Sequence, residues 1–348
     1  MTKDKNIIIK NIYYMLSYVY QGLQLKTYKK IESESFEYIQ DLFSAILTIG
    51  ITSQLKHGLS REYIEKSDNL STLRGKINIV ESIMLRINDD FRLSCWFDEL
   101  SENNLMNRIL KTTMLLLIND GNVKHENKVT LKKIIPFFSE ISILQSSAIN
   151  WQRLSYNRNN ATYLMLMNIC YMVLHELLHT TEKGEQKLAS FLDDQKMSRL
   201  YEKFILEFYK KHFPQFQPAA REIRWNTIGT TDFLPRMQSD TMLTDNNNGK
   251  KLIIDAKYHK KIFQTQYEID TVKSNNLYQI FSYVKNEDKS NTGLVDGMLL
   301  YAKTDDTKIQ NIEYNFGGNR ININTLDLNN DFLNIKTQLF SIVDQWQR

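Results

Sequence analysis

Apolar residues recur every three or four positions in several stretches of the chain, and this spacing predicts amphipathic helices. We expect helices at residues 12–23, 36–58, 101–120, 160–180, 190–212, 273–285 and 330–346. The pattern is strongest over 101–120, where Ser101 precedes the apolar stripe and belongs to a residue type that often caps a helix N-terminus. Helices are therefore expected in both halves of the chain.

Alternating apolar and polar residues, or short apolar runs between turns, predict strands in other stretches. The expected strand regions are 59–98, 221–225, 231–243, 251–258, 296–302 and 309–314. A polar stretch at 180–187 separates two predicted domains, 1–185 and 186–348. The order of elements in the second domain is typical of a mixed sheet flanked by helices. We therefore predict an α+β protein, in which a mixed α/β domain precedes a domain built on a mixed central sheet.

The composition predicts a well-packed protein of a reducing compartment. Of the 348 residues, 42% are hydrophobic and 11% aromatic, so the chain can form a large core. The net charge of +4 is compatible with nucleic acid binding. The two cysteines, Cys95 and Cys170, are far apart and form no metal motif. Because we find neither a signal peptide nor an apolar run long enough to span a membrane, we expect a soluble cytoplasmic protein.

The stretch from Asp240 to Lys257 combines two acids with a predicted β-hairpin. Residues 245–250 are rich in Asp, Asn and Gly, which favour a tight turn, and the apolar run 252–254 follows them. Folding the hairpin brings Asp240 close to Asp255. Because alternate strand residues point to the same face, Lys257 shares a face with Asp255. The pattern thus predicts two carboxylates and an ammonium group converging on one sheet face.

Such a set is suited to metal-assisted phosphodiester hydrolysis. Asp240 and Asp255 would bind Mg²⁺, which prefers hard oxygen ligands, and the backbone carbonyl of Ala256 could add another oxygen. The metal would lower the pKa of a bound water, and Lys257 would position that water or help to deprotonate it. The alternative is a solvated hairpin in which Asp255 and Lys257 form a surface ion pair worth only about 0–1 kcal/mol.

Charged residues on either side of the hairpin could extend the site. Glu202, on the helix predicted upstream, could add a third acid to the metal or its waters. Lys260 and Lys261, just after the hairpin, could contact the phosphates of a DNA backbone. For all three residues, a solvated charge on an exposed surface is the alternative.

A polar pair lies on the helix predicted downstream of the hairpin. Gln279 and Tyr283 are four residues apart and therefore share one face of that helix. If this face is turned toward the hairpin, the pair could hold a phosphate or contact Lys257. The alternative is that both residues lie on an exposed helix face.

Taken together, these residues resemble the PD-(D/E)xK nuclease superfamily. The resemblance is carried by Asp240, the tripeptide 255–257, Glu202 and the Gln279/Tyr283 pair. It departs from the superfamily's name before Asp240, where Ser239 stands in place of proline and Pro235 lies five positions earlier. The proline carries no chemistry, so the resemblance implies an endonuclease domain for residues 186–348.

Four longer segments resemble a narrower family, the McrC nuclease subunits of McrBC modification-dependent restriction systems. The segments are Asn11-Ile12-Tyr13-Tyr14-Met15-Leu16, 103–111, 234–240 and 253–258. In that family a separate AAA+ GTPase, McrB, binds GTP, forms a ring and recognises methylated double-stranded DNA. The resemblance implies that residues 1–185 dock on such a ring and stimulate GTP hydrolysis, while residues 186–348 cut DNA with Mg²⁺.

The sequence contains no nucleotide-binding loop that would make this chain the GTPase itself. Neither Gly75-Lys76-Ile77 nor Gly249-Lys250-Lys251 fits the pattern G-x-x-x-x-G-K-[ST]. Candidate contacts with a ring are the helix 101–119 and the turn Arg74-Gly75-Lys76. A core helix and an ordinary turn would explain the same two patterns.

One further motif points to different chemistry. The segment His175-Glu176-Leu177-Leu178-His179 fits H-E-x-x-H, in which two histidines bind Zn²⁺ and the glutamate acts as general base. A third ligand would have to come from Glu185, Asp193, Asp194 or Glu202. On the predicted helix, His175 and His179 lie on a polar face that solvent or a partner would also explain. A zinc metallopeptidase and a non-catalytic activator of an AAA+ NTPase are therefore the alternative functions.

Overall fold

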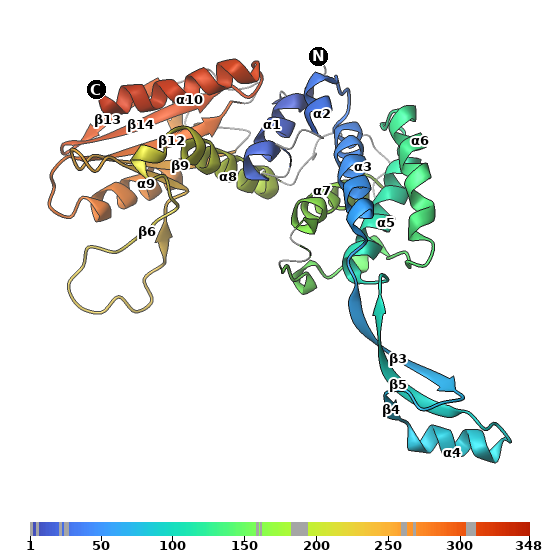
Figure 1. The fold of residues 1–348 in the computed structure, drawn as a ribbon. Helices are drawn as coiled ribbons and strands as arrows, with labels where there is room; N and C mark the ends of the chain where they lie inside the picture. The colour runs from blue at the N-terminus through green and yellow to red at the C-terminus, as the bar shows by residue number, and fades with distance from the viewer. Residues whose placement is uncertain are drawn as a thin grey trace. The chain divides into compact units, whose positions relative to one another are not determined.

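The computed structural model describes residues 3–4, 7–20, 23, 28–157, 160, 162–181, 194–258, 263–266, 269–303 and 311–348. The chain divides into two compact units, shown as ribbons in Figure 1. One unit combines residues 1–42 with 185–348, and the other comprises residues 43–184. The second unit is thus inserted, in chain order, into a unit formed by both ends of the sequence.

A five-stranded mixed sheet forms the centre of the first unit. Its strands follow the order β13 (Asn311–Phe316), β14 (Asn319–Leu326), β12 (Val295–Ala302), β9 (Lys251–Lys257) and β8 (Thr241–Thr244). The three inner strands are parallel, and both edge strands pair antiparallel with their neighbours. Every residue of β12 is buried, as expected for a central strand covered on both faces.

Helices cover both faces of this sheet, which confirms the predicted architecture (Figure 1). The helices are α8 (Asp194–His212), α9 (Ser274–Glu287) and α10 (Phe332–Gln347). On one face, Ile280 of α9 shares a core with Ile253 of β9. On the other face, Leu252 of β9 lies beside Trp346 of α10. Neighbouring residues of β9 therefore point to different helices, as strand geometry requires.

Several short elements complete the first unit. They are β1 (Lys3–Asp4), β2 (Ile7–Ile8), α2 (Lys29–Ser33), a 3₁₀ turn (Pro214–Phe216), β6 (Glu222–Ile223), β7 (Met237–Gln238), β10 (Phe263–Gln266) and β11 (Ile269–Val272). The pairs β1–β2, β6–β7 and β10–β11 are antiparallel. The pair β6–β7 leads directly into β8 and so into the central sheet.

The second unit consists of a helical body and a long β-arm. The body contains α3 (Ile39–His57, from residue 43), α5 (Leu105–Asn119), α6 (His125–Ile134), α7 (Tyr163–Thr181) and 3₁₀ turns at Ile135–Phe138, Ser146–Ala148 and Trp151–Arg153. The arm contains β3 (Glu62–Leu70), β4 (Lys76–Ile77), α4 (Ile79–Ile87) and β5 (Leu93–Ser101). β5 lies between β3 and β4, and Figure 1 shows α4 at the end of the arm farthest from the helices.

The first helix of the chain, α1 (Ile9–Val19), packs within the sheet-containing unit. Tyr18 of α1 contacts the rings of Phe204 and Phe208 on α8, and its hydroxyl lies 2.8 Å from Nε2 of His212. The sequence predicted a single domain over residues 1–185, whereas the structure assigns the first 42 residues to the other unit. Burial of aromatic side chains between α1 and α8 accounts for this difference.

A buried amide ties the same helix to the end of the central sheet. The Nδ2 atom of Asn11 donates hydrogen bonds of 2.8 Å to the carbonyl oxygens of Leu328 and Asn330. Leu328 and Asn330 lie 317 and 319 positions after Asn11 in the chain. Local sequence patterns carry no information about such distant contacts, so the predicted boundary could not take them into account.

Other elements also differ from the predictions. The region 59–98, predicted as strands, contains the helix α4. Helix α5 begins after Asn104, whose side-chain oxygen accepts a 3.0 Å hydrogen bond from the Asn107 N–H, and not after Ser101. Most of the region 231–243 is a loop that ends in β7 and β8. None of the helices described here is both long and apolar enough to cross a membrane.

Replacing Asn11 with alanine is expected to destabilise the sheet-containing unit. The substitution removes the amide that donates hydrogen bonds to two carbonyl oxygens. A buried polar group left without a hydrogen-bond partner costs about 1–3 kcal/mol of stability. We therefore expect the free energy of unfolding, measured by urea denaturation, to fall by about that amount. Asn334→Ala removes an exposed amide on α10 of the same unit and serves as the control. Equal effects of the two substitutions would contradict a stabilising role of Asn11.

Candidate functional site

The pairing of β8 with β9 places two aspartates opposite each other. Thr241 pairs with Ile254, so Asp240, one residue earlier, comes opposite Asp255, one residue later. The turn between the strands contains Gly249 with φ +73°, a left-handed conformation that costs glycine little. The hairpin predicted from the sequence is therefore confirmed.

Lys257 lies between one of these aspartates and a neighbouring helix. Its Nζ is 2.8 Å from Oδ2 of Asp255, and the Lys257 side chain is only 17% exposed. Nζ also donates a 3.0 Å hydrogen bond to Oε1 of Gln279. At the edge of β9 that pairs with β8, Oδ2 of Asp240 accepts a 2.8 Å hydrogen bond from the Ala256 N–H. The predicted carboxylates and ammonium group thus converge at the end of β9.

Helix α9 fixes the orientation of the amide that Lys257 contacts. Nε2 of Gln279 donates a 2.8 Å hydrogen bond to the hydroxyl of Tyr283, and Tyr283 belongs to the core between α9 and the sheet. The amide oxygen is thereby directed at Lys257. A continuous chain of polar contacts runs from the buried Tyr283 to Asp255.

Burial and mutual repulsion change the proton affinities of these groups. Burial, followed by the negative charges of Asp255 and Glu202, raises the pKa of Asp240 to about 7. Burial raises the pKa values of Asp255 and Glu202 as well, although Lys257 opposes both shifts. Burial would lower the pKa of Lys257, but Asp255, Asp240 and Glu202 together raise it above its ordinary value. Glu202 of α8 and the hairpin residues Asp255 and Lys257 therefore affect one another's proton affinities.

The site carries more negative than positive charge, and a divalent cation can balance it. Asp240, Asp255 and Glu202 supply three carboxyl groups, against the single ammonium group of Lys257. The N–H and C=O of a strand residue point to the same edge, so the carbonyl of Ala256 faces the side of Asp240. Carboxylate and carbonyl oxygens are the hard donors that Mg²⁺ prefers. These residues therefore fit a magnesium ion.

The two aspartates form the centre of this candidate ligand set. Within the described ranges, no group of three or more His, Cys, Asp and Glu side chains is arranged to hold a metal ion. Lys260 and Lys261, predicted to contact DNA, lie outside the described residues. His175 and His179 lie within α7, but their side chains fall outside the described part of the chain. The zinc site and the DNA contacts of the two lysines thus remain predictions.

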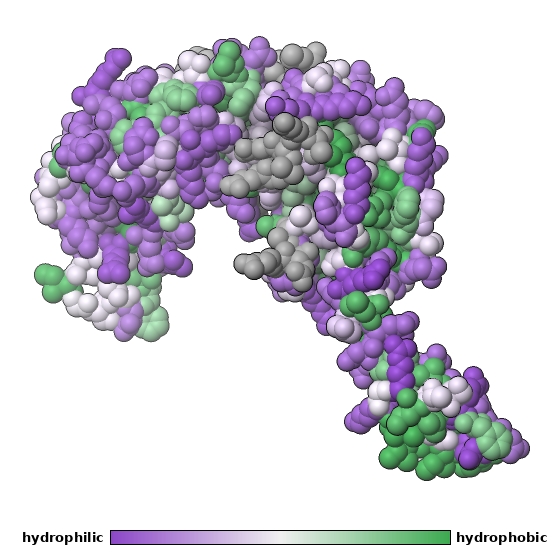
Figure 2. Space-filling view, in the orientation of Figure 1, coloured by the Kyte–Doolittle hydropathy of each residue, from purple (hydrophilic) through white to green (hydrophobic). Residues whose placement is uncertain are grey.

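The end of the arm is a second candidate site, of a different kind. Five apolar residues of α4 recur at helical spacing and are between 55% and 69% exposed: Ile79, Val80, Ile83, Met84 and Ile87. Figure 2 shows hydrophobic residues gathered at this end of the arm. An amphipathic helix normally turns such a stripe toward a core. Because α4 has no buried residue, the stripe is available to another molecule.

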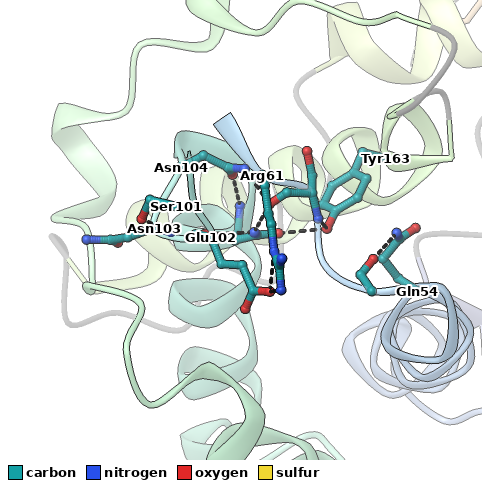
Figure 3. A network of polar contacts seen from close by, with 10 residues as sticks. Gln54, Arg61, Ser101, Glu102, Asn103, Asn104 and Tyr163 are labelled. Atoms are coloured by element: carbon teal, nitrogen blue, oxygen red, sulfur yellow. Dashed lines mark hydrogen bonds and ion pairs between the residues drawn. The ribbon is translucent and has the colours of Figure 1, made fainter. Parts of the chain in front are cut away.

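The base of the arm is held firmly to the helical body (Figure 3). The carbonyl oxygen of Ser60 accepts hydrogen bonds of 2.8 Å from Nδ2 of both Asn104 and Asn107. The N–H of Ser60 donates to the hydroxyl of Tyr163, which in turn donates to Oδ1 of Asn107. The segment 103–111, identified by its resemblance to McrC proteins, therefore fixes the root of the arm.

The two segments considered as candidate contacts with an AAA+ ring have different environments. The turn 74–76 lies in the arm, and the Arg74 guanidinium carbon is 4.1 Å from the centre of the Phe97 ring. Gly75 has φ +70°, and a Cβ there would come within 2.2 Å of the Trp96 carbonyl oxygen, so no other residue fits. Helix α5, in contrast, is largely buried in the body. Of the two, the arm offers the exposed surface.

Comparisons with known proteins agree with this arrangement. Residues 2–302 match the family described as the McrBC 5-methylcytosine restriction system component. Over 346 residues the chain is 27% identical to the type IV methyl-directed restriction enzyme EcoKMcrBC of Escherichia coli strain K12, with 98% of each chain covered. The fold is similar to a chain in the refined half-complex of Thermococcus gammatolerans McrB AAA+ hexamers with bound McrC. The TM-score is 0.55 at 16% identity, covering 97% of this chain and 75% of that chain.

Replacing Asp240 with asparagine is expected to stabilise the metal-free protein at alkaline pH. The pKa of Asp240 is about 7 in the folded chain and near 3.8 when unfolded, so the folded state binds more protons between these values. The stability of the fold therefore decreases as the pH rises from about 4 to about 7, and above pH 7 the ionised carboxylate destabilises the fold by the full amount. We expect Asp240→Asn to raise the free energy of unfolding in EDTA by about 2–4 kcal/mol at pH 8, and much less at pH 4.

Urea denaturation at both pH values measures this effect. Asp344→Asn alters an exposed carboxylate on α10 and is the matched control. A stabilisation by Asp240→Asn that is the same at pH 4 and pH 8 would contradict the raised pKa.

Proposed function

The chain belongs to the McrBC 5-methylcytosine restriction family, and on that premise we propose that it is the DNA-cleaving subunit of a methylation-dependent restriction complex. The observation that carries the proposal is the convergence of Asp240, Asp255 and Lys257 at the end of β9. This set has the acid–acid–lysine composition of PD-(D/E)xK nucleases. The relative from Escherichia coli is a restriction enzyme, which supports DNA as the substrate.

We assign the binding of Mg²⁺ to the carboxylates of Asp240 and Asp255 and the carbonyl of Ala256, with Glu202 reaching the metal's waters. When bound, the ion supplies a positive charge beside the scissile phosphate and lowers the pKa of a coordinated water. Asp255 is buried and Asp240 is half-buried, so their charges are only partly screened by solvent. The deficit of positive charge in the metal-free site supports this assignment.

Lys257 positions the attacking water in this proposal. Because the neighbouring carboxylates raise its pKa, its ammonium group stays protonated at neutral pH and donates hydrogen bonds. Its contacts with Asp255 and Gln279 restrict where Nζ can lie. The third donor direction of the ammonium group is then available to a water or to a phosphate oxygen. Gln279 and Tyr283 act indirectly, by holding Lys257 in place.

We also infer that the arm docks on a McrB-like AAA+ GTPase ring. The similar structure from Thermococcus gammatolerans contains McrB AAA+ hexamers with bound McrC. In this chain the apolar stripe of α4 supplies the exposed surface, and the clamp around Ser60 holds the root of the arm. The sequence has no P-loop, so GTP would be bound and hydrolysed by the partner. Activation and cleavage are thereby assigned to separate units of one chain.

Replacing Asp255 with asparagine should separate the two activities. We expect cleavage of methylated DNA, measured with the partner GTPase, GTP and Mg²⁺, to fall by at least about 100-fold, because charge stabilisation at a reacting phosphate is worth several kcal/mol. Stimulation of GTP hydrolysis should be unchanged, since Asp255 and the arm belong to different units. Asp344→Asn is the control for the loss of a carboxylate. Cleavage at the wild-type rate by Asp255→Asn would disprove the nuclease site.

Replacing Ile83 with aspartate tests the arm. The side chain is already 55% exposed, so the fold should tolerate the charge, whereas a partner surface packed on the stripe should not. Loss of a central apolar contact costs an interface about 2 kcal/mol or more, and the half-maximal chain concentration for GTPase stimulation should rise about 30-fold. Ser71→Asp adds the same charge elsewhere on the arm as a control. Equal stimulation by both variants would exclude α4 from the interface.

A further inference from the structure

A loop of 13 residues, 224–236, projects from the sheet-containing unit between β6 and β7 (Figure 1). Its root is fastened at several points. Nε1 of Trp225 donates a 2.8 Å hydrogen bond to the carbonyl of Pro235, and the Trp225 ring packs against the core. The N–H of Asn226 donates a 2.7 Å hydrogen bond to Oδ1 of Asn286 on α9. The loop therefore has a fixed base and a free outer part.

Two large apolar side chains stand on this outer part. Ile228 and Phe233 are 104% and 105% exposed, so neither contributes to the packing of the folded chain. Phe233 also has φ +66°, a left-handed conformation that is a genuine outlier for a bulky residue. Glycine or asparagine would occupy the position at lower cost. Folding alone thus gives no reason for a phenylalanine here, and such strain points to a function.

The loop lies at the catalytic end of the sheet. Asp240 follows Phe233 by seven residues, and a chain of that length spans at most about 25 Å. At about 3.4 Å per base pair, this distance corresponds to about seven base pairs of DNA. A duplex that is held by a phosphate at Asp240 and runs toward the loop reaches the loop tip within about seven base pairs.

The charges at the root favour a polyanion. Arg221 and Arg224 are both exposed, and neither forms an ion pair with any residue that the structure describes. Arg236 is paired with Glu222 at 3.0 Å, so that pair is already neutral. The one acid on the outer part of the loop is Asp232. Two unpaired guanidinium groups beneath an apolar tip are the arrangement expected for phosphate contacts that flank an inserted side chain.

We propose that Phe233, supported by Ile228, is a wedge that inserts between base pairs of the DNA beside the phosphate to be cut. The proposal rests on the nuclease function proposed above. Insertion of an apolar side chain partly unstacks a base step and bends the duplex. Here the bend turns the backbone toward Asp240 and Asp255, while Arg221 and Arg224 hold the flanking phosphates. The left-handed backbone at Phe233 keeps the ring directed outward before DNA arrives.

The test uses the assembled complex, with the partner GTPase, and a methylated duplex that carries 2-aminopurine at successive positions. In the Asp255→Asn background, where DNA is bound but not cut, we expect 2-aminopurine fluorescence to rise at one step. Phe233→Asn in the same background should abolish this rise. With Asp255 intact, Phe233→Asn should cut on the order of 5- to 150-fold more slowly, the range expected for loss of one stacking contact.

Two controls separate the wedge from other effects. Phe233→Asn suits the left-handed backbone, so its melting temperature should equal or exceed that of the wild type, which excludes misfolding as the cause. Leu333→Asn removes another exposed apolar side chain, on α10 of the same unit, and should leave both signals unchanged. Stimulation of GTP hydrolysis should also be unchanged in Phe233→Asn.

The outcomes distinguish this proposal from the nuclease proposal. Cleavage and fluorescence that remain at wild-type levels in Phe233→Asn would overturn the wedge and leave the nuclease assignment intact. Loss of complex assembly by Phe233→Asn, seen by sedimentation, would overturn it in favour of a protein interface. A fluorescence rise that depends on Phe233, with no cleavage by the wild type, would support the wedge and contradict the nuclease.

Discussion

The pairing of Thr241 with Ile254 fixes how Asp240, Asp255 and Lys257 of the candidate site lie relative to one another. Strand residues alternate between faces, so a shift of β9 by one position against its neighbours would turn Asp255 and Lys257 away from α9 and toward α10. Lys257 would then lose Gln279, and Asp240 would lose the Ala256 N–H. The turn at residues 245–250 and the buried β12 beside β9 both hold the register in place. The arrangement of the candidate site thus depends on backbone pairing that involves none of its charged side chains.

Both units of the chain carry features that folding alone does not explain. One unit contains carboxyl groups that burial and mutual repulsion make harder to ionise; both effects raise the pKa of Asp240 and lower the stability of the metal-free fold above that pKa. The other exposes an apolar helix face that could have been turned inward. A bound cation would relieve the first feature, and a protein surface packed on α4 would relieve the second. Both features thus support the proposal that the chain acts together with other components.

The hairpin of β8 and β9 could be predicted because its information is local. A turn rich in Asn, Asp and Gly, with acids at matching distances on either side, determines both the strand pairing and the position of the charges. Glu202 and Gln279 could be named as candidates, but their approach to Lys257 depends on how α8 and α9 pack on the sheet. Helix α4 escaped prediction because its β-branched residues favour strands. Its capping signal, Asn78 followed by Glu81, was nevertheless present.

The position of the first helix shows how the chain is completed during synthesis. Asn11 finds its partners only after Leu328 and Asn330 have been made, and residues 43–184 lie between these segments in the sequence. On a ribosome, the inserted unit is therefore synthesised before the sheet-containing unit can close. A chain whose translation stops early carries the arm but lacks a complete sheet. The sheet-containing unit thus becomes complete only when translation has nearly reached the end of the sequence.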